Sequence, residues 1–564
     1  MKRRLSRLIA LLFVAGISAL ALFMILRREE SNRAPIEDMA IVYIDGAQIV
    51  KKALLNQYIT ESNRRLLATM AASQLDDEKL SESLTASITN LDNTGLALNR
   101  PIYAYLNGDL EQSFEFVTIV EVLDAAKVDD MVKALSQLAE QDGALPIHLC
   151  HEGENRTFEL DGIYCGYNSS RFAVAIYENM DGKELMDKAL SRPLTDLSRF
   201  SGDDIATYLD ANKLIAITKL SMEREIEMLR IKAEESEYDF EREMYDEQIA
   251  SLESNLQQLA TIMPTLGEKA SITSSLRFEA GEIELRTKAH DIEMQNDIIK
   301  RVSDDHLNYI EDSTIAVINY AIDGAALSKA INDKLPEQLS SMLGISRNEF
   351  NMGLQIALDA ISSINGDVTL SLGALDGKEL SRYNSYARSY DRQVSLDGGK
   401  VLVMADVKDD YIISNIATFA GGMLTPEAEG MYSVELSHDM RIDLGQQHNT
   451  LFFGLNTPYC MATQPATSAR WHKAVAESYG YILIDIENMM QSGYIATHYA
   501  IAMEELDEED KEIADALVEA SDYIYTRLNS HSDAELTLVF DNKEKNALAT
   551  IAEVVMPYIM RSIN

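Results

Sequence analysis

The sequence predicts an α+β fold in which an N-terminal transmembrane helix precedes two tandem, duplicated sheet-plus-helix units, each with a helical hairpin insertion. Three observations lead to this prediction: an uncharged apolar run near the N-terminus, a strand-to-helix phrase that occurs twice about half a chain apart, and long charged segments with helical spacing of apolar residues. The 564 residues, 46% of them hydrophobic, are enough to bury more than one core. A formal net charge of −41 argues against nucleic acid as a partner, because so acidic a chain repels phosphate.

The apolar run, which begins at Leu8 and ends at Leu26, is predicted to be a membrane anchor. At about 1.5 Å per residue a helix of this length approaches the thickness of a bilayer's hydrocarbon core. The apolar region of a cleaved signal peptide is usually shorter, at about 7 to 15 residues. The small residues at 19–21 could form a cleavage site, so a cleaved signal peptide is an alternative interpretation of the run. A buried helix of a soluble protein is a third interpretation. Under the anchor reading, residues 1–7 form a cytoplasmic tail, residues 27–38 a linker, and the body of a single-pass protein lies outside the cytoplasm.

An internal duplication follows from segments that match in the same order. The phrase IDGAQIVKKAL at residues 44–54 returns as IDGAALSKAI at residues 322–331, each time after an apolar run. Three further pairs follow: 116–135 with 400–419, 208–215 with 483–490, and 275–285 with 537–548. These matches predict a first α+β repeat at residues 39–300 and a second at residues 301–564.

The repeated phrase contains an aspartate where a strand is expected to turn into a helix, Asp45 in the first copy and Asp323 in the second. An aspartate at this position accepts hydrogen bonds from the first backbone N–H groups of the helix, and the glycine that follows relaxes the corner. We interpret both aspartates as helix caps and not as catalytic residues.

A long charged stretch at residues 219–263 contains neither glycine nor proline and predicts two helices. Its apolar residues recur three and four apart at Met222, Ile226, Leu229 and Ala233, and again at Ile249, Leu252, Leu256, Leu259 and Met263. The pattern blurs around residues 234–239, which favours a hairpin over a single rod. Patterns near 489–503 and 509–528 predict a similar hairpin in the second repeat. Such a hairpin either covers the sheet or projects as an arm that grips a partner.

Two cysteines lie in a segment predicted to form folded-back strands. The turns place Cys150 near Thr157 and Cys165 near Phe158, so the two cysteines are neighbours without being directly opposed. A disulfide between Cys150 and Cys165 is one reading, and two half-buried thiols are the other.

Motifs that carry chemistry are absent from the sequence. It contains no nucleophile elbow, zinc-binding helix, phosphate loop, dinucleotide fingerprint or calcium loop. Histidine and cysteine are common zinc ligands, so His148, Cys150 and His151 are a candidate zinc site. Strand alternation, however, places His151 on the opposite face from the other two, which argues against this site. We therefore predict no catalytic residue, no cofactor and no metal.

The remaining candidates also have simpler structural explanations. The pairs His290-Asp291 and Asp305-His306 lie in polar segments that we interpret as solvated helix surface. The side chains of sequence neighbours point apart on a helix, so these pairs are not interpreted as catalytic. Trp471, the sole tryptophan, is interpreted as a loop anchor packed on the sheet, with contact to a partner or a sugar as the alternative.

The order of these segments resembles that of a known family. An apolar strand before Asp45 is followed by NTGLALNRPIYAYL at 93–106, the strand and helix at 116–135, LTDLSRF at 194–200 and IATYLDANKL at 205–214. This order resembles a family of uncharacterised Gram-negative envelope proteins, a domain of unknown function usually exported as a lipoprotein. The resemblance implies an extracytoplasmic location and no established activity. The chain departs from the family because no cysteine follows the apolar run to carry a lipid.

The sequence therefore predicts a membrane-anchored, periplasmic envelope protein that is a non-enzymatic binding or structural scaffold with another envelope protein as its partner. The alternative is an extracytoplasmic hydrolase with its site in a cleft between the two repeats. A His–Asp pair or converging carboxylates in a cleft would favour the enzyme, and a continuous apolar or helical surface would favour the binding protein.

Overall fold

A computed structural model describes most of the chain after residue 37. The described residues are 38–58, 82, 85–87, 90–109, 113–141, 147–160, 163–192, 200–236, 238–292, 298–303, 305–334, 355, 358–384, 389–408, 412–413, 424–428, 430–437, 440–447, 449–457, 470–504 and 506–563.

The predicted membrane span from Leu8 to Leu26 lies outside the described residues. Among the helices that the structure does describe, none combines the length and the apolar character that crossing a bilayer requires. The structure therefore gives no support to four related predictions, which are corrected here. These are a transmembrane helix, a signal anchor, the membrane as a partner and a single-pass periplasmic placement. The prediction relied on hydropathy, which reports only the composition of a segment. A membrane span also requires a long apolar helix, and the described part of the chain contains none.

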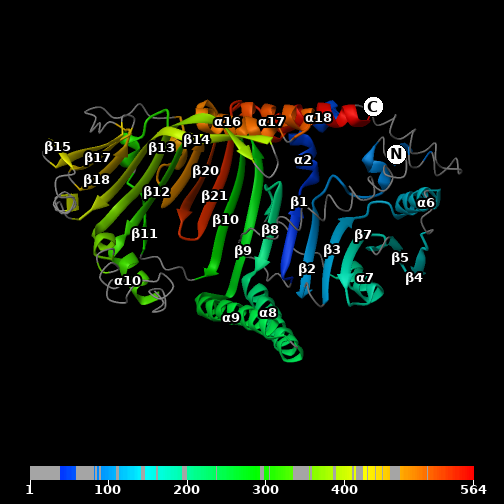
Figure 1. Cartoon of the computed structure of the whole chain (residues 1–564). Helices are drawn as coiled ribbons and strands as arrows, with labels where there is room; N and C mark the ends of the chain where they lie inside the picture. The colour runs from blue at the N-terminus through cyan, green and yellow to red at the C-terminus, as the bar shows by residue number, and fades with distance from the viewer. Residues whose placement is uncertain are drawn as a thin grey trace. The chain divides into compact units, whose positions relative to one another are not determined.

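The predicted α+β fold class, with its anchor and two tandem sheet-plus-helix units, is also corrected. The protein forms a large antiparallel sheet accompanied by helices (Figure 1). Every strand pairing with a described register is antiparallel. The sequence prediction erred because alternating strand and helix segments reveal their order along the chain but not which strands lie side by side.

The chain separates into two compact units that are not simple halves. The first comprises Met1–Glu279, Glu284–Glu293 and Asn546–Pro557, and the second comprises Ala280–Ile283, Met294–Lys545 and Tyr558–Asn564. The predicted repeat boundary after residue 300 stays a prediction, because compact grouping does not by itself define a repeat.

In the first unit the strands pair in the order β10–β9–β8–β1–β2–β3–β7–β6–β5–β4. They are β1 (Ala40–Ile44), β2 (Ile102–Asp109), β3 (Ser113–Glu121), β4 (Cys150–Glu152), β5 (Asn155–Leu160), β6 (Ile163–Tyr167), β7 (Arg171–Glu178), β8 (Ile205–Asp210), β9 (Leu266–Glu279) and β10 (Glu282–Ile292), which belongs mostly to this unit. The short strand β1 is central, since Val42 lies opposite Ala104 of β2 on one side and Thr207 of β8 on the other.

In the second unit the order is β21–β20–β19–β12–β13–β14–β18–β17–β16–β15. These strands are β12 (Ala316–Asp323), β13 (Ile364–Asn384), β14 (Ser389–Val407), β15 (Thr425–Ala428), β16 (Met431–Ser437), β17 (Met440–Gln447), β18 (Thr450–Leu455), β19 (Gly480–Asp485), β20 (Ser521–Ser530) and β21 (Asp533–Phe540), and the two-residue β11 (Ile299–Lys300) pairs with the end of β12.

The two units therefore have the same strand order when β1 is matched to β12. Three of the four sequence matches agree with this correspondence, because they join β1 to β12, β3 to β14 and β8 to β19. The fourth match was wrong: it joined the end of β9 to the end of β21, and these strands hold different places in the two orders. Any strand that ends at a turn gives a similar pattern of residues, so the pattern alone could not distinguish these strands.

Helices connect the strand ends (Figure 1). In the first unit they are α2 (Gly46–Lys52), α3 (Leu55–Tyr58), α6 (Ala125–Gln141), α7 (Gly182–Ser191), α8 (Ala211–Glu235) and α9 (Asp239–Ile262), with 3-10 turns η1 (Leu91–Thr94) and η3 (Met263–Thr265). In the second unit they are η4 (Asp305–Tyr309), α10 (Gly324–Lys334), α14 (His472–Val475), α15 (Ile486–Gln491), α16 (Gly493–Met503) and α17 (Glu508–Ala520). Helix α18 (Ala547–Ile563) follows β21 along the chain and belongs mostly to the first unit. The helix expected at 509–528 ends at Ala520, because the next residues form β20.

Aspartates cap the helices that leave these strands. The Asp45 carboxylate accepts the N–H of Gln48 at 3.0 Å, and the Asp323 carboxylate accepts the N–H groups of Ala325 and Ala326 at 3.1 Å. Both aspartates satisfy backbone donors that have no partner within the helix. The same geometry recurs at the starts of α8 and α15, where Asp210 and Asp485 each accept an N–H at 2.9 Å.

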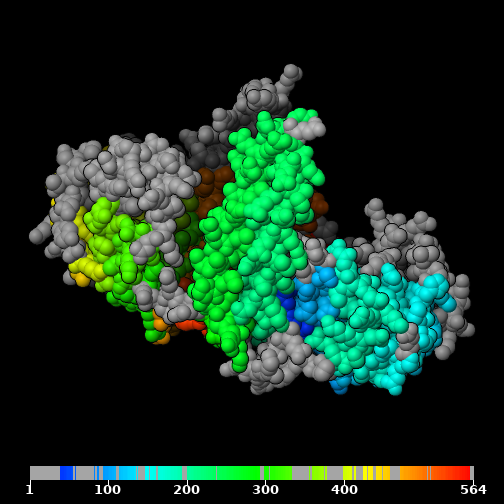
Figure 2. Space-filling model, turned by 90° about the horizontal axis from the view of Figure 1, so that it is seen from below, coloured from blue at the N-terminus to red at the C-terminus, as the bar shows by residue number. Residues whose placement is uncertain are grey.

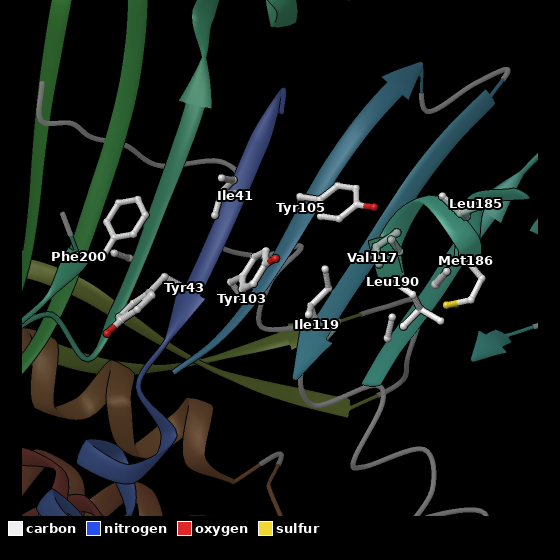
Figure 3. Close-up of a cluster of buried hydrophobic side chains, with 14 residues drawn as sticks. Ile41, Tyr43, Tyr103, Tyr105, Val117, Ile119, Leu185, Met186, Leu190 and Phe200 are labelled. Carbon is white, nitrogen blue, oxygen red and sulfur yellow. The ribbon is translucent and has the colours of Figure 1, made fainter. Parts of the chain in front are cut away.

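The principal core of the first unit lies between its sheet and α7. Figure 3 shows Leu185, Met186 and Leu190 of α7 beside Val117 and Ile119 of β3. The cluster also contains Ile41 and Tyr43 of β1, Tyr103 and Tyr105 of β2, Ala173 and Ala175 of β7, and Ala189, Phe200 and Ala206.

One glycine permits the close approach of α7 to the sheet. A Cβ atom on Gly166 of β6 would lie only 2.4 Å from Cγ of Met186, so a larger residue there would displace the Met186 side chain from its place against the sheet.

The core of the second unit contains the sole tryptophan. Trp471 is 1% exposed and packs with Tyr481, Leu483 and Val539. The interpretation of Trp471 as a loop anchor is confirmed, and the alternative of an exposed contact with a partner or a sugar is wrong.

We expect Trp471 to report on the folding of the second unit. Because its indole is buried, the native protein should have blue-shifted emission and should be quenched by acrylamide several-fold less than free N-acetyltryptophanamide. Guanidinium should shift the emission to the red in one transition. A native spectrum already typical of solvated tryptophan would contradict this packing.

Candidate functional site

The two candidate cysteines are free thiols, one exposed and one buried. Their predicted neighbours are confirmed, since Cys150 of β4 lies opposite Thr157 and Cys165 of β6 lies opposite Phe158. Strand β5 therefore separates the two cysteines by two strand spacings, roughly 9 to 10 Å, which exceeds the Cα separation of about 7 Å that a disulfide tolerates. Burial raises the pKa of the Cys165 thiol to about 12, so it stays protonated and unreactive at neutral pH.

The zinc reading at His148, Cys150 and His151 gains no support. Among the residues that the structure describes, no group of three or more histidine, cysteine, aspartate or glutamate side chains is arranged to hold a metal ion.

The prediction that His290 and His306 lie on solvated helices was wrong. His290 belongs to strand β10, and His306 belongs to the 3-10 turn η4 with only 1% of its surface exposed. The prediction for His306 failed because the charged residues around it make the sequence of η4 look solvated. Leu307 and Ile310, in and beside the turn, belong instead to the buried core of the second unit. This burial brings His306 into contact with residues far away in the sequence.

His306 lies at the centre of a polar network in the second unit. Its Nδ1 is 2.7 Å from Oγ1 of Thr369 on β13, and its Nε2 is 3.1 Å from Oδ1 of Asp406 on β14. Asp406 also accepts the Thr450 hydroxyl of β18 at 2.9 Å and the N–H of Asp367 at 3.1 Å. The network thus ties η4 to three adjacent strands.

The two aspartates of this network have opposite pKa shifts. Burial by itself would raise the pKa of Asp406, but the hydrogen bonds from His306 and Thr450 outweigh burial and hold this pKa below its usual value. For Asp367, burial raises the pKa despite two bonds from the Ser303 N–H at 3.1 and 3.2 Å. The carboxyl of Asp406 therefore keeps its charge to a lower pH than the carboxyl of Asp367.

Thr369, His306 and Asp406 form a hydroxyl–imidazole–carboxylate chain, the combination of groups used in nucleophilic acyl transfer. Such chemistry requires that a substrate carbonyl reach the hydroxyl. Thr369 is completely buried, however, and His306 is almost so. The arrangement therefore serves to satisfy buried polar groups, and it lacks the access that a hydrolase needs.

A second polar cluster lies in the first unit, at the start of β8. Lys52 of α2 contacts the fully buried Asp204 at 2.7 Å, and Asp204 also accepts the N–H of Phe278 at 2.7 Å. Next to it, Asp203 accepts Nε of Arg277 at 2.8 Å, and burial raises the pKa of Asp203 against the opposing effect of Arg277. The cluster joins α2 to β8 and β9 and presents no open carboxylate pair.

Many of the exposed large apolar side chains of the described residues lie on the hairpin of α8 and α9. Its inner seam follows the predicted spacing, with Ile226 and Leu229 buried and Ile249, Leu252, Leu256 and Leu259 partly buried. The chain reverses between Glu235 and Asp239, close to the predicted break. Large apolar side chains nevertheless remain exposed along it: Leu214, Leu220, Met228, Ile231, Tyr238, Phe240, Met244 and Ile262.

This exposure follows from the position of the hairpin. Figure 1 shows α8 and α9 extending beyond the ends of β8 and β9, and Figure 2 shows both helices, in green, along their length at the molecular surface. No residue of α9 within the described chain is fully buried. The prediction that the hairpin projects is therefore favoured over the prediction that it covers the sheet.

Comparison with models of known protein families, with curated proteins and with solved structures finds no match to this chain. The resemblance to the envelope family therefore stays a prediction.

We expect Asp406→Asn to destabilise the second unit by about 2 kcal/mol, because it weakens several hydrogen bonds to a charged acceptor. An aspartate with a lowered folded-state pKa stabilises the protein above its unfolded pKa, and this stabilisation is lost as pH falls through the folded pKa. The difference from wild type should thus be largest near neutral pH and should shrink below about pH 4. Guanidinium titrations followed by Trp471 emission measure it. Asp305→Asn, at the exposed neighbour of His306, should have little effect, and an equal loss there would contradict the role of the network.

We expect Lys52→Met to destabilise the first unit by about 3 kcal/mol, because it leaves the buried charge of Asp204 without its cation. Adding Asp204→Asn should recover part of this loss, so the double variant should be more stable than additivity predicts. Circular dichroism in denaturant measures the free energy of unfolding of Lys52→Met, Asp204→Asn and the double variant. The exposed Lys51→Met is the matched control, and strict additivity of the Lys52 and Asp204 changes would show that the pair does not interact.

Proposed function

We propose that this protein is a non-enzymatic binding or scaffold protein that engages another protein through the α8–α9 hairpin. One observation carries this proposal: the hairpin buries apolar residues on its inner seam and leaves a second set in water. Met228 is 55% exposed, Tyr238 61% and Phe240 68%. Clusters of exposed aromatic, methionine and aliphatic side chains are typical of protein-binding surfaces, because their burial on association removes apolar area from water.

Hydrogen bonds at both ends of the hairpin fix its conformation in the protein alone. At its base, Asp210 caps α8 and Asn212 donates to the backbone oxygen of Gly267 at 3.0 Å. At its tip, the Arg242 side chain donates to the backbone oxygen of Ser236, and the Ser236 hydroxyl lies 2.6 Å from Glu241. A preorganised arm loses less conformational entropy on binding than a flexible one, which supports a role in recognition.

The hydrolase alternative has less support. The hydroxyl and the imidazole of the Thr369–His306–Asp406 chain are buried, and the acidic pair at Asp203 and Asp204 is occupied by Arg277 and Lys52. Neither arrangement leaves a nucleophile or a general base facing a substrate.

We expect affinity purification of the full-length chain from cell extract to recover a partner in stoichiometric amount. A variant carrying Leu220→Gln, Met228→Gln, Ile231→Gln and Phe240→Gln should recover at least about tenfold less, because it removes the apolar anchors while keeping good helix formers.

The matched control carries Ser251→Ala, Ser254→Ala and Gln258→Ala, at exposed polar positions of α9. It should recover the partner as wild type does, and circular dichroism should show equal helix content in all three proteins. A partner retained by the glutamine variant, or lost equally by the control, would contradict binding through the hairpin.

A further inference from the structure

We propose that the α8–α9 hairpin is a site of reversible methionine oxidation, at which a peroxide converts Met228, Met244 and Met263 to sulfoxides and makes the apolar surface polar. The change of surface is a property of the hairpin itself. Its effect on a partner rests on the proposed function, which it would regulate.

The most exposed methionines of the described chain lie on this hairpin. Met228 of α8 is 55% exposed, Met244 of α9 43%, and Met263 at the end of α9 44%. The other exposed methionines among the described residues are Met180, in the loop before α7, and Met440, on β17. The hairpin therefore presents three thioethers to water on neighbouring elements.

Packing separates these methionines from those that the fold protects. Met222 also belongs to α8, but it lies in the seam against α9 and is only partly exposed. Met186 of α7 and Met404 of β14 are completely buried. A peroxide must contact the sulfur atom to react with it, so the rate of oxidation follows exposure. Met228 is thus expected to react early, and Met186 and Met404 late.

The reaction needs only a peroxide as co-reactant. A lone pair of the thioether sulfur attacks one oxygen of hydrogen peroxide, the O–O bond breaks, and the second oxygen leaves as water after it takes up the proton of the first. The sulfur loses two electrons and the peroxide gains them. A thiol-dependent reductase reverses the change, because two thiols become a disulfide while the sulfoxide oxygen leaves as water.

Oxidation at these positions changes the surface of the hairpin without removing its internal packing. A sulfoxide is a polar hydrogen-bond acceptor, and burying it without a donor costs free energy that burying a thioether does not. The seam residues Ile226 and Leu229 are buried and carry no sulfur, so the contact between α8 and α9 is retained. Oxidation of a core methionine such as Met186 would instead disrupt the fold. The exposed positions therefore suit a switch of surface chemistry.

The first test maps oxidation by mass spectrometry of peptides from the native full-length chain after timed exposure to hydrogen peroxide. Met228, Met244 and Met263 should each be oxidised at least about tenfold faster than Met186 and Met404, and the rates should converge in guanidinium. Helix content and the emission of Trp471 should stay constant while the hairpin methionines react. Equal native rates at Met228 and Met186, or unfolding in step with oxidation of the hairpin, would overturn the proposal.

The second test measures retention on a phenyl column, which serves as the apolar probe, and compares each protein with its own untreated sample. Wild type should elute earlier after peroxide, because its exposed thioethers have become polar. A variant with Met228→Leu, Met244→Leu and Met263→Leu keeps apolar side chains of similar volume that peroxide does not oxidise, so its retention should change much less. The matched control, Met180→Leu with Met440→Leu, should shift as wild type does. An equal shift in the hairpin variant would overturn the proposal.

Reversal and partner recovery complete the test. Methionine sulfoxide reductase with dithiothreitol should restore the retention of oxidised wild type, and a lasting loss would overturn reversibility. Recovery of the partner from cell extract should fall several-fold when wild type is oxidised and should change little when the hairpin leucine variant is treated.

The outcomes separate this inference from the proposed function. If oxidised wild type recovers a hairpin-dependent partner in full, the regulation fails and the proposed function stands. If recovery never depends on the hairpin, the proposed function fails, and the peptide map and the phenyl column still decide whether the hairpin is the oxidation site.

Discussion

Antiparallel backbone hydrogen bonding is the constraint on which the rest of this structure depends. In each unit the strands extend outward in the same order from both edges of β1 or β12. A strand buried in this way must satisfy every N–H and C=O through its neighbours, so its register cannot slip without exposing the core face. The helices begin where such strands end, and an aspartate at the junction satisfies the first donors of the helix.

A sheet of this kind also buries polar side chains, and the structure pairs many of them. The His306 network joins a 3-10 turn to three strands, and the Lys52–Asp204 contact joins a helix to the start of a strand. Both arrangements contain residue types that are common in active sites. Thr369, His306 and Asp204 are buried, so the contacts that they make hold elements of the fold together.

The α8–α9 hairpin differs from the rest of the protein because it escapes this constraint. Helices satisfy their own backbone, so a hairpin can leave the sheet and carry side chains into water. One face of α8 is needed for the seam, and the apolar residues of its other face have no part in holding the hairpin together. This unused apolar face is the feature of the described chain that most directly favours a binding role.

The local features of this protein could be predicted from its sequence. The spacing of Ile226, Leu229, Ile249 and Leu252 gave the hairpin and its turn, the turns around Thr157 and Phe158 gave the strand register, and the position of Asp45 after an apolar run gave a helix cap. Each of these depends on residues a few positions apart, where the periods of helix and strand operate. Tertiary structure alone decided which strands lie side by side, that β5 separates Cys150 from Cys165, and that His306 meets Asp406 across one hundred residues. Lateral pairing and burial depend on contacts between distant segments, and no periodicity within a segment encodes the identity of its neighbour.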